Sequence, residues 1–180
     1  SGRIEDLERR VEESLALTGE RHPRPGRWLH DTARELWAHG HEAAAARTLD
    51  RALAWFREHV DAGSGAAADV AVRRDFGRAL YDAGQWAEAE GIFRRLVEDA
   101  APGDVQAIGG HHGHLRGHLD EGYLAAIAWH RGDEAETDRW RRALRGMDRR
   151  FLYGADRLWL GILELLDGDE VGAVSEIRRA

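Results

Sequence analysis

The side chains best suited to chemistry lie in a short histidine-rich segment in the middle of the chain. Its ligand-type residues are His111, His112, His114, His118, Asp120 and Glu121. If this segment is helical, His114 and His118 share one face, a spacing that suits zinc or nickel. Leu115 stands where a metallopeptidase helix has its glutamate, which argues against hydrolase chemistry. Two interpretations remain open: a metal site built from His111, His114 and His118, and a solvated loop that leads into a helix.

No other set of residues has the spacing of a catalytic motif. The serines at 14, 64 and 175 have no Gly-x-Ser-x-Gly setting, and no glycine-rich phosphate loop follows a strand. Two carboxylate pairs, Asp133 with Glu134 and Asp169 with Glu170, directly follow glycines, where they are expected to cap a helix. We therefore expect no enzymatic activity and no cofactor.

Composition limits the class of protein and of partner. The 180 residues carry a net charge of -7, which argues against a general nucleic-acid surface. There is no cysteine, and no apolar run approaches the about 20 residues that span a bilayer, so we expect a cytoplasmic protein without membrane contact. Only three prolines occur in a chain rich in Ala, Leu, Glu and Arg, which favours helix throughout.

Four glycines occupy the same place in a repeated pattern. They are Gly40, Gly84, Gly132 and Gly168. Seven residues earlier stand Ala33, Gly77, Ala125 and Gly161; three earlier stand Trp37, Tyr81, Trp129 and Leu165; five later stand Ala45, Ala89, Thr137 and Ala173. Small residues suit close contact between helices, and glycine suits a turn with a left-handed backbone. The pattern therefore predicts one helix-turn-helix unit used four times.

The repeated units account for most of the chain. The predicted helices are 28–39 with 41–59, 69–83 with 85–99, 119–130 with 133–147, and 153–166 with 170–180. A further helix is expected over 4–18, followed by a proline-containing connector. We divide the chain into residues 1–26, holding this helix and connector, and a repeat domain at 27–180. Arg139, Arg141, Arg142 and Arg145 are expected to form a solvated face of one helix.

The second unit resembles the tetratricopeptide repeat. The matching residues are Gly77, Leu80, Gly84, Trp86, Ala89, Phe93, Ala101 and Pro102. The first unit matches through Ala33, Leu36, Gly40, Ala45, Leu49 and Ala52, and the fourth through Gly161, Gly168, Ala173 and Ile177. The third unit departs at Thr137 and Arg141, where Trp140 is expected to supply the packing. The resemblance implies an all-α fold, a right-handed α-solenoid of about four units plus the N-terminal helix.

In such arrays the first helices line a concave groove, and the resemblance places groove positions ten, six and three residues before each turn glycine. The expected groove residues are His30, Arg34, Trp37, Arg74, Arg78, Tyr81 and Trp129. Arginine pairs bidentately with carboxylates, and aromatic rings offer rigid apolar area. This set predicts binding of an acidic or carboxy-terminal peptide, although the three aromatic residues could instead pack between units.

Three hypotheses follow for the role of the chain. The first is a non-catalytic scaffold that binds a protein or peptide, within a longer bacterial regulatory protein. The second, from a different class, is a small-molecule or metal-sensing domain that uses the histidine segment or the aromatic groove. The third is a homodimer formed through an uncovered end of the repeat array.

Overall fold

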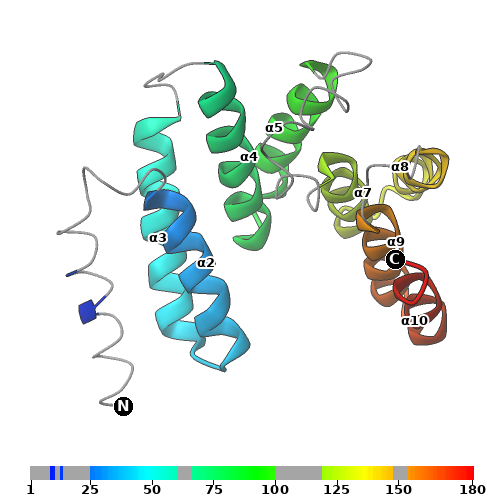
Figure 1. Ribbon diagram of the computed structural model, residues 1–180, viewed down its shortest axis with the longest axis horizontal. Helices are drawn as coiled ribbons and strands as arrows, with labels where there is room; N and C mark the ends of the chain where they lie inside the picture. The colour runs from blue at the N-terminus through cyan, green and yellow to red at the C-terminus, as the bar shows by residue number, and fades with distance from the viewer. Residues whose placement is uncertain (1–8, 11–12, 14–24, 61–65, 100–118, 148–153) are drawn as a thin grey trace. The chain divides into compact units, whose positions relative to one another are not determined.

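The chain is helical in all the parts that the structure describes. The computed structural model describes residues 9–10, 13, 25–60, 66–99, 119–147 and 154–180. The helices are α2 (Pro25–Ala38), α3 (Glu42–His59), α4 (Ala66–Asp82), α5 (Trp86–Asp99), α7 (Asp120–His130), α8 (Glu134–Gly146), α9 (Ala155–Leu166) and α10 (Glu170–Ile177) (Figure 1). Among the described residues there is no strand. The prediction of an all-α fold is confirmed for these ranges.

All four turn glycines have the backbone that the pattern predicts. Their φ angles lie between +70° and +77° at Gly40, Gly84 and Gly132, and reach +82° at Gly168. Each glycine N–H donates to the carbonyl three residues earlier, and the next N–H donates to the carbonyl five residues before it. At the first turn these bonds are Gly40 N to Trp37 O (2.9 Å) and His41 N to Leu36 O (2.8 Å). This is the Schellman end of a helix, and it recurs at each of the four turns.

The small residues of the pattern lie where helices meet. Ala33, Ala45, Ala125 and Ala173 are at most 2% exposed. At Gly161 an added Cβ would lie 2.9 Å from Ile177 Cγ1 and 3.2 Å from Ala173 O, so glycine lets α9 approach α10. The two predicted carboxylate caps are also present: Asp133 Oδ1 accepts from Glu136 N (3.0 Å), and Asp169 Oδ1 accepts from Gly172 N (2.8 Å).

The helices form two compact units, Ser1–Gln85 and Trp86–Ala180. In the first unit α2 packs along α3, and α4 contacts both of them. The Phe56 ring of α3 stacks on Phe76 of α4 with centroids 5.6 Å apart. Gly26, in the first turn of α2, lies so close to α3 that an added Cβ would be 2.3 Å from the Trp55 ring. Aromatic rings of α3 therefore take part in its contacts with both α2 and α4.

The second unit is built around α7, which contacts α5, α8 and α9. Every residue of α7 from Gly122 to Ala128 is buried. The Tyr123 ring stacks on Phe93 of α5 (4.6 Å between centroids) and meets Trp159 of α9 edge-on (4.5 Å). Trp140 and Leu144 of α8 are buried, as predicted for the third repeat, and α9 pairs with α10.

Some predicted boundaries differ from the structure. Helix α2 begins at Pro25, inside the predicted connector, because a proline at the first helical position loses no hydrogen bond. Gly154, with φ of +80°, precedes α9 and was not part of the predicted pattern. Of the predicted helix 4–18, only Arg9, Arg10 and Glu13 are described, and they are helical. The division into residues 1–26 and 27–180 stays a prediction.

Candidate functional site

In the first unit, three predicted groove residues lie along one face of α2. His30, Arg34 and Trp37 follow one another at intervals of four and three residues, which places them in a row. The row runs beside α4 because His30 Nε2 lies 2.8 Å from Asp82 Oδ2 and Arg34 Nε lies 3.6 Å from the same oxygen. We call this surface, with Asp82 and Tyr81 of α4, the α2–α4 face.

The three α2 residues differ sharply in exposure. His30 is 1% exposed, and its second ring nitrogen, Nδ1, has no hydrogen-bond partner. The side chain of Arg34 is 56% exposed and Trp37 is 50% exposed. All seven tryptophans of the chain lie in described ranges, and Trp37 is the most exposed of them. Arg34 and Trp37 can therefore reach a ligand, whereas His30 acts on the site only by holding Asp82.

The predicted groove residues on α4 are mostly turned inward. Arg78 is 4% exposed, with Nη1 lying 3.6 Å from Oδ1 of the buried Asp75. Arg74 and Tyr81 are half-buried. Because this guanidinium is buried and lies beside a carboxylate of the same helix, it is not available to a surface ligand. Of the three predicted groove residues on α4, only Arg74 and Tyr81 are exposed enough to touch a partner.

Trp129, the remaining predicted groove residue, belongs to the second unit. It lies on α7, where its Nε1 donates to Oδ1 of Asp167, the residue after α9, at 2.8 Å. Arg141 of α8 also pairs with Asp167 and donates to Leu163 O at 3.2 Å. The prediction of a solvated Arg141 is therefore wrong, because its side chain is only 16% exposed and ties α8 to α9. Arg139, Arg142 and Arg145 are exposed, as predicted.

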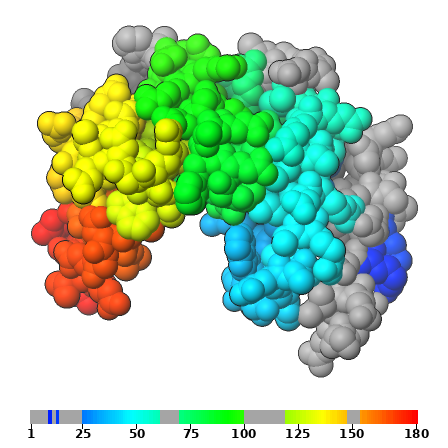
Figure 2. All heavy atoms as spheres, turned by 180° about the vertical axis from the view of Figure 1, so that it is seen from behind, coloured from blue at the N-terminus to red at the C-terminus, as the bar shows by residue number. Residues whose placement is uncertain are grey.

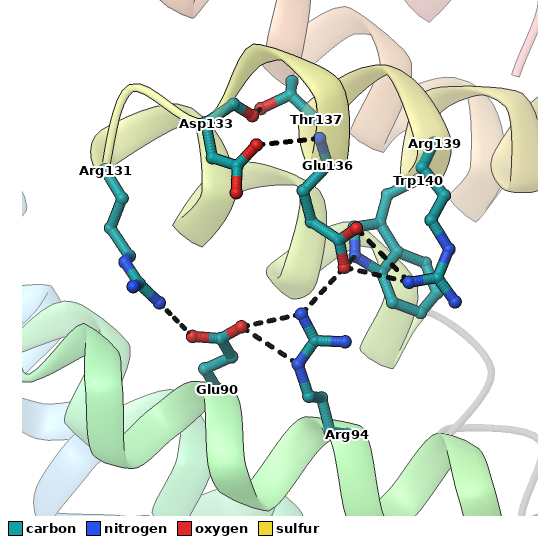
Figure 3. A network of polar contacts seen from close by, with 8 residues as sticks. All are labelled: Glu90, Arg94, Arg131, Asp133, Glu136, Thr137, Arg139 and Trp140. Atoms are coloured by element: carbon teal, nitrogen blue, oxygen red, sulfur yellow. Dashed lines mark hydrogen bonds and ion pairs between the residues drawn. The ribbon is translucent and has the colours of Figure 1, made fainter.

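A second polar cluster joins α5 to the α7–α8 hairpin (Figure 3). Arg94 donates to Glu90 Oε1 (2.8 Å) and to Glu136 Oε1 (2.7 Å), and Arg131 pairs with the other oxygen of Glu90. Glu136 also accepts from Trp140 Nε1 at 3.0 Å. We call Glu90, Arg94 and Glu136 the α5–α8 network.

Electrostatics in this network favour the charged forms. Burial raises the pKa of Glu136, but hydrogen bonds from Arg94 and Arg139 outweigh this and hold it below its usual value. The same hydrogen bond with Glu136, and that with Glu90, raises the pKa of Arg94. Nearby, burial lowers the pKa of His130, whose ring stacks on Trp86 with centroids 4.4 Å apart. Since each carboxylate already has an arginine partner, the network is suited to joining helices rather than to proton transfer.

The structure gives no further support to a metal centre. His111, His114 and His118 lie outside the described residues. Within the described ranges, no three side chains of the histidine, cysteine, aspartate or glutamate type are grouped as ligands would be. Nor does any helix in these ranges combine the length and apolar character needed to cross a membrane.

Two carboxylates that organise the units were not among the predicted functional residues. Asp82 is the last residue of α4 and Asp167 directly follows α9, and each contacts a side chain of an earlier helix. A carboxylate at the C-terminal end of a helix is unfavourable toward the helix dipole, so its presence there indicates a compensating partner. That signal was available in the sequence.

No family model matches the chain, and no curated protein is significantly similar to it.

Proposed function

We propose that the chain is a non-catalytic module that binds a protein or peptide on the α2–α4 face. The observation that carries the proposal is Trp37, which is half-exposed and lies one helical turn from the exposed Arg34. A tryptophan held on a helix offers a large apolar surface with little loss of conformational freedom, which is why it dominates many interfaces. The Trp37 ring and the Arg34 guanidinium can therefore contact the same partner.

The charge of Arg34 indicates what that partner presents. An arginine has five N–H donors, and the contact with Asp82 involves Nε at 3.6 Å. More than half of the side chain is exposed, so the Nη donors can bind a ligand. Because guanidinium groups bind carboxylates with two parallel hydrogen bonds, we expect the ligand to present a carboxylate. The proposed ligand is a peptide with an acidic side chain or a free carboxy terminus, next to an apolar residue that packs on Trp37.

The helix contacts within each unit support a repeat architecture of the tetratricopeptide kind. In the first unit, α2 contacts its hairpin partner α3 and also α4, the first helix of the following repeat. In the second unit, α7 has the same relation to α8 and α9. We propose that these hairpins stack as a right-handed solenoid, the scaffold on which a first-helix surface such as the α2–α4 face serves binding.

Peptide pools that end either in a free carboxylate or in an amide test this proposal. Bound sequences from the pools would be titrated against the native chain, Arg34→Met and Trp37→Ala. Arg73→Met is the control, since Arg73 is exposed on α4 but lies about 80° round the helix from Tyr81 and about 180° from Asp82. We expect preference for the carboxylate and a loss of about tenfold or more in both face variants. Equal binding by the native chain and both variants, or binding by none of the pools, would refute the α2–α4 face.

A further inference from the structure

The Asp82 carboxylate occupies a fixed place on the α2–α4 face. Its Oδ2 lies 2.8 Å from Nε2 of His30, a residue that is 1% exposed. Because an ionised carboxylate only accepts hydrogen bonds, Nε2 is the donor of this bond. Since His30 is buried, a ligand at the surface does not compete for the bond. Asp82 therefore keeps its place whether or not a ligand is bound.

Asp82 and Arg34 are close enough to attract each other but are not joined by a hydrogen bond. Arg34 Nε lies 3.6 Å from Asp82 Oδ2, which is beyond hydrogen-bond length. The Asp82 side chain is 23% exposed and the Arg34 side chain is 56% exposed. A ligand on the α2–α4 face therefore meets a negative and a positive group side by side.

The end of α4 adds to the negative charge beside Arg34. Asp82 is the last residue of α4, and the C-terminal end of a helix carries a partial negative charge. Arg78, one turn earlier on α4, is buried beside Asp75 and does not present its charge to the solvent. Glu35, which follows Arg34 on α2, is exposed. The positive charge of Arg34 is thus flanked by negative groups, which disfavours a ligand that carries several acidic residues together.

On the basis of the peptide-binding function proposed above, we propose that Asp82 determines the specificity of the α2–α4 face. The face selects a carboxylate that has a basic group beside it and rejects a run of acidic residues. The carboxylate of the ligand binds Arg34 and its basic group binds Asp82, so that the four charges alternate in sign. A second acidic group in that place would oppose Asp82 and the end of α4. His30 is the positioning residue for Asp82.

Three forms of one peptide test this specificity. The peptide retained most tightly from the pools is made with lysine, glutamine or glutamate next to its carboxylate, and each form is titrated against the native chain and Asp82→Asn. Asparagine keeps the size of the side chain and can still accept from His30, so the variant removes the charge alone. At a protein surface, two like charges about 7 Å apart weaken binding by about fivefold. We expect the native chain to prefer lysine over glutamate by about tenfold or more, and Asp82→Asn to bind the glutamate form about fivefold more tightly than the native chain does.

Two further comparisons separate the charge of Asp82 from general effects. Asp50→Asn, the same change at an exposed residue of α3 (cyan in Figure 2, beside the blue α2), should keep the native preference. His30→Phe cannot hold Asp82 and should reduce the preference, whereas His30→Gln, whose amide can donate, should retain more of it. The preference is a ratio of two affinities on one variant, so a partial loss of folding, which lowers both affinities alike, leaves it unchanged. An equal preference in the two His30 variants would contradict the positioning role.

The outcomes distinguish this specificity from the binding function itself. If no form of the peptide binds the native chain, the peptide-binding function fails and the specificity with it. If the peptides bind the native chain and lose affinity in Arg34→Met, the function stands. In that case the role of Asp82 alone is overturned when the native chain does not prefer lysine, or when Asp82→Asn keeps the full preference.

Discussion

Two glycines of the second unit, Gly132 and Gly91, should respond to alanine in opposite directions. Gly132 forms the turn between α7 and α8 with φ of +70°, whereas Gly91 lies exposed within α5. At neither site would an added Cβ meet another atom within 4 Å. The two changes are therefore chemically identical and sterically free, and they differ only in the backbone conformation that the alanine must adopt.

The magnitudes follow from that difference. Alanine in the left-handed region destabilises the folded chain by about 1–2 kcal/mol relative to glycine. Replacing glycine by alanine also lowers the conformational entropy of the unfolded chain, which stabilises the fold by about 0.4–1 kcal/mol. Gly132→Ala should therefore lower the free energy of unfolding by about 1 kcal/mol. In a helix interior alanine is better than glycine by about 0.5–1 kcal/mol, so Gly91→Ala should raise it by that amount. The two variants should differ by about 1.5–2 kcal/mol.

Urea unfolding followed by far-UV circular dichroism measures both changes under identical conditions. Gly132→Asn is the internal check, because asparagine tolerates the left-handed region better than alanine and should fall between alanine and glycine. If Gly132→Ala shifted the midpoint in the same direction and by the same amount as Gly91→Ala, the explanation of the repeat by its turn glycines would be refuted.

Three further predictions concern the core and the ionisable groups of the second unit. Gly122→Ala should destabilise by about 1–3 kcal/mol in thermal unfolding, because its Cβ would lie 2.2 Å from the Trp159 ring; Trp159→Leu in the same background should recover part of the loss. The pKa of Glu136 is lower in the folded chain, so its stabilisation is complete above the unfolded value and is lost as pH falls through the folded one. Between about pH 6 and about pH 3, Glu136→Gln should therefore lose less stability than the native chain, and an equal loss would contradict the role given to Arg94. Burial lowers the pKa of His130, so its ring should titrate below 6.5 by NMR, and a midpoint at or above that value would contradict its burial.

The local features of this fold could be predicted from the sequence, because they depend on interactions between residues that are close together along the chain. Each Schellman turn is closed by hydrogen bonds that span three and five residues, so a glycine and its neighbours are sufficient to predict it. The burial of Ala33 and Ala173 followed from the same register. Helix starts were less predictable, as Pro25 shows, because proline is compatible both with a connector and with a first turn.

The candidate site was harder to predict from the sequence, because the residues that contact each other there are far apart along the chain. The partner of His30 is Asp82, 52 positions away, and the partner of Trp129 is Asp167, 38 positions away. Periodicity identifies the faces of a helix but not which face the next helix covers. Hence His30 and Arg34, four residues apart on the same helix, could not be separated into a buried and an exposed residue until α4 was in place.

The complete burial of α7 has a consequence for how the second unit is made on the ribosome. Residues Gly122–Ala128 carry almost no polar side-chain groups, and one of the helices that covers them, α9, ends at Leu166, 38 residues later. At about 5–20 residues per second, that helix is complete about 2–8 s after Ala128 has been added. During this interval the nascent chain exposes an apolar segment that the finished protein never shows. The helix that is best protected in the folded unit is thus the one most in need of shielding during synthesis.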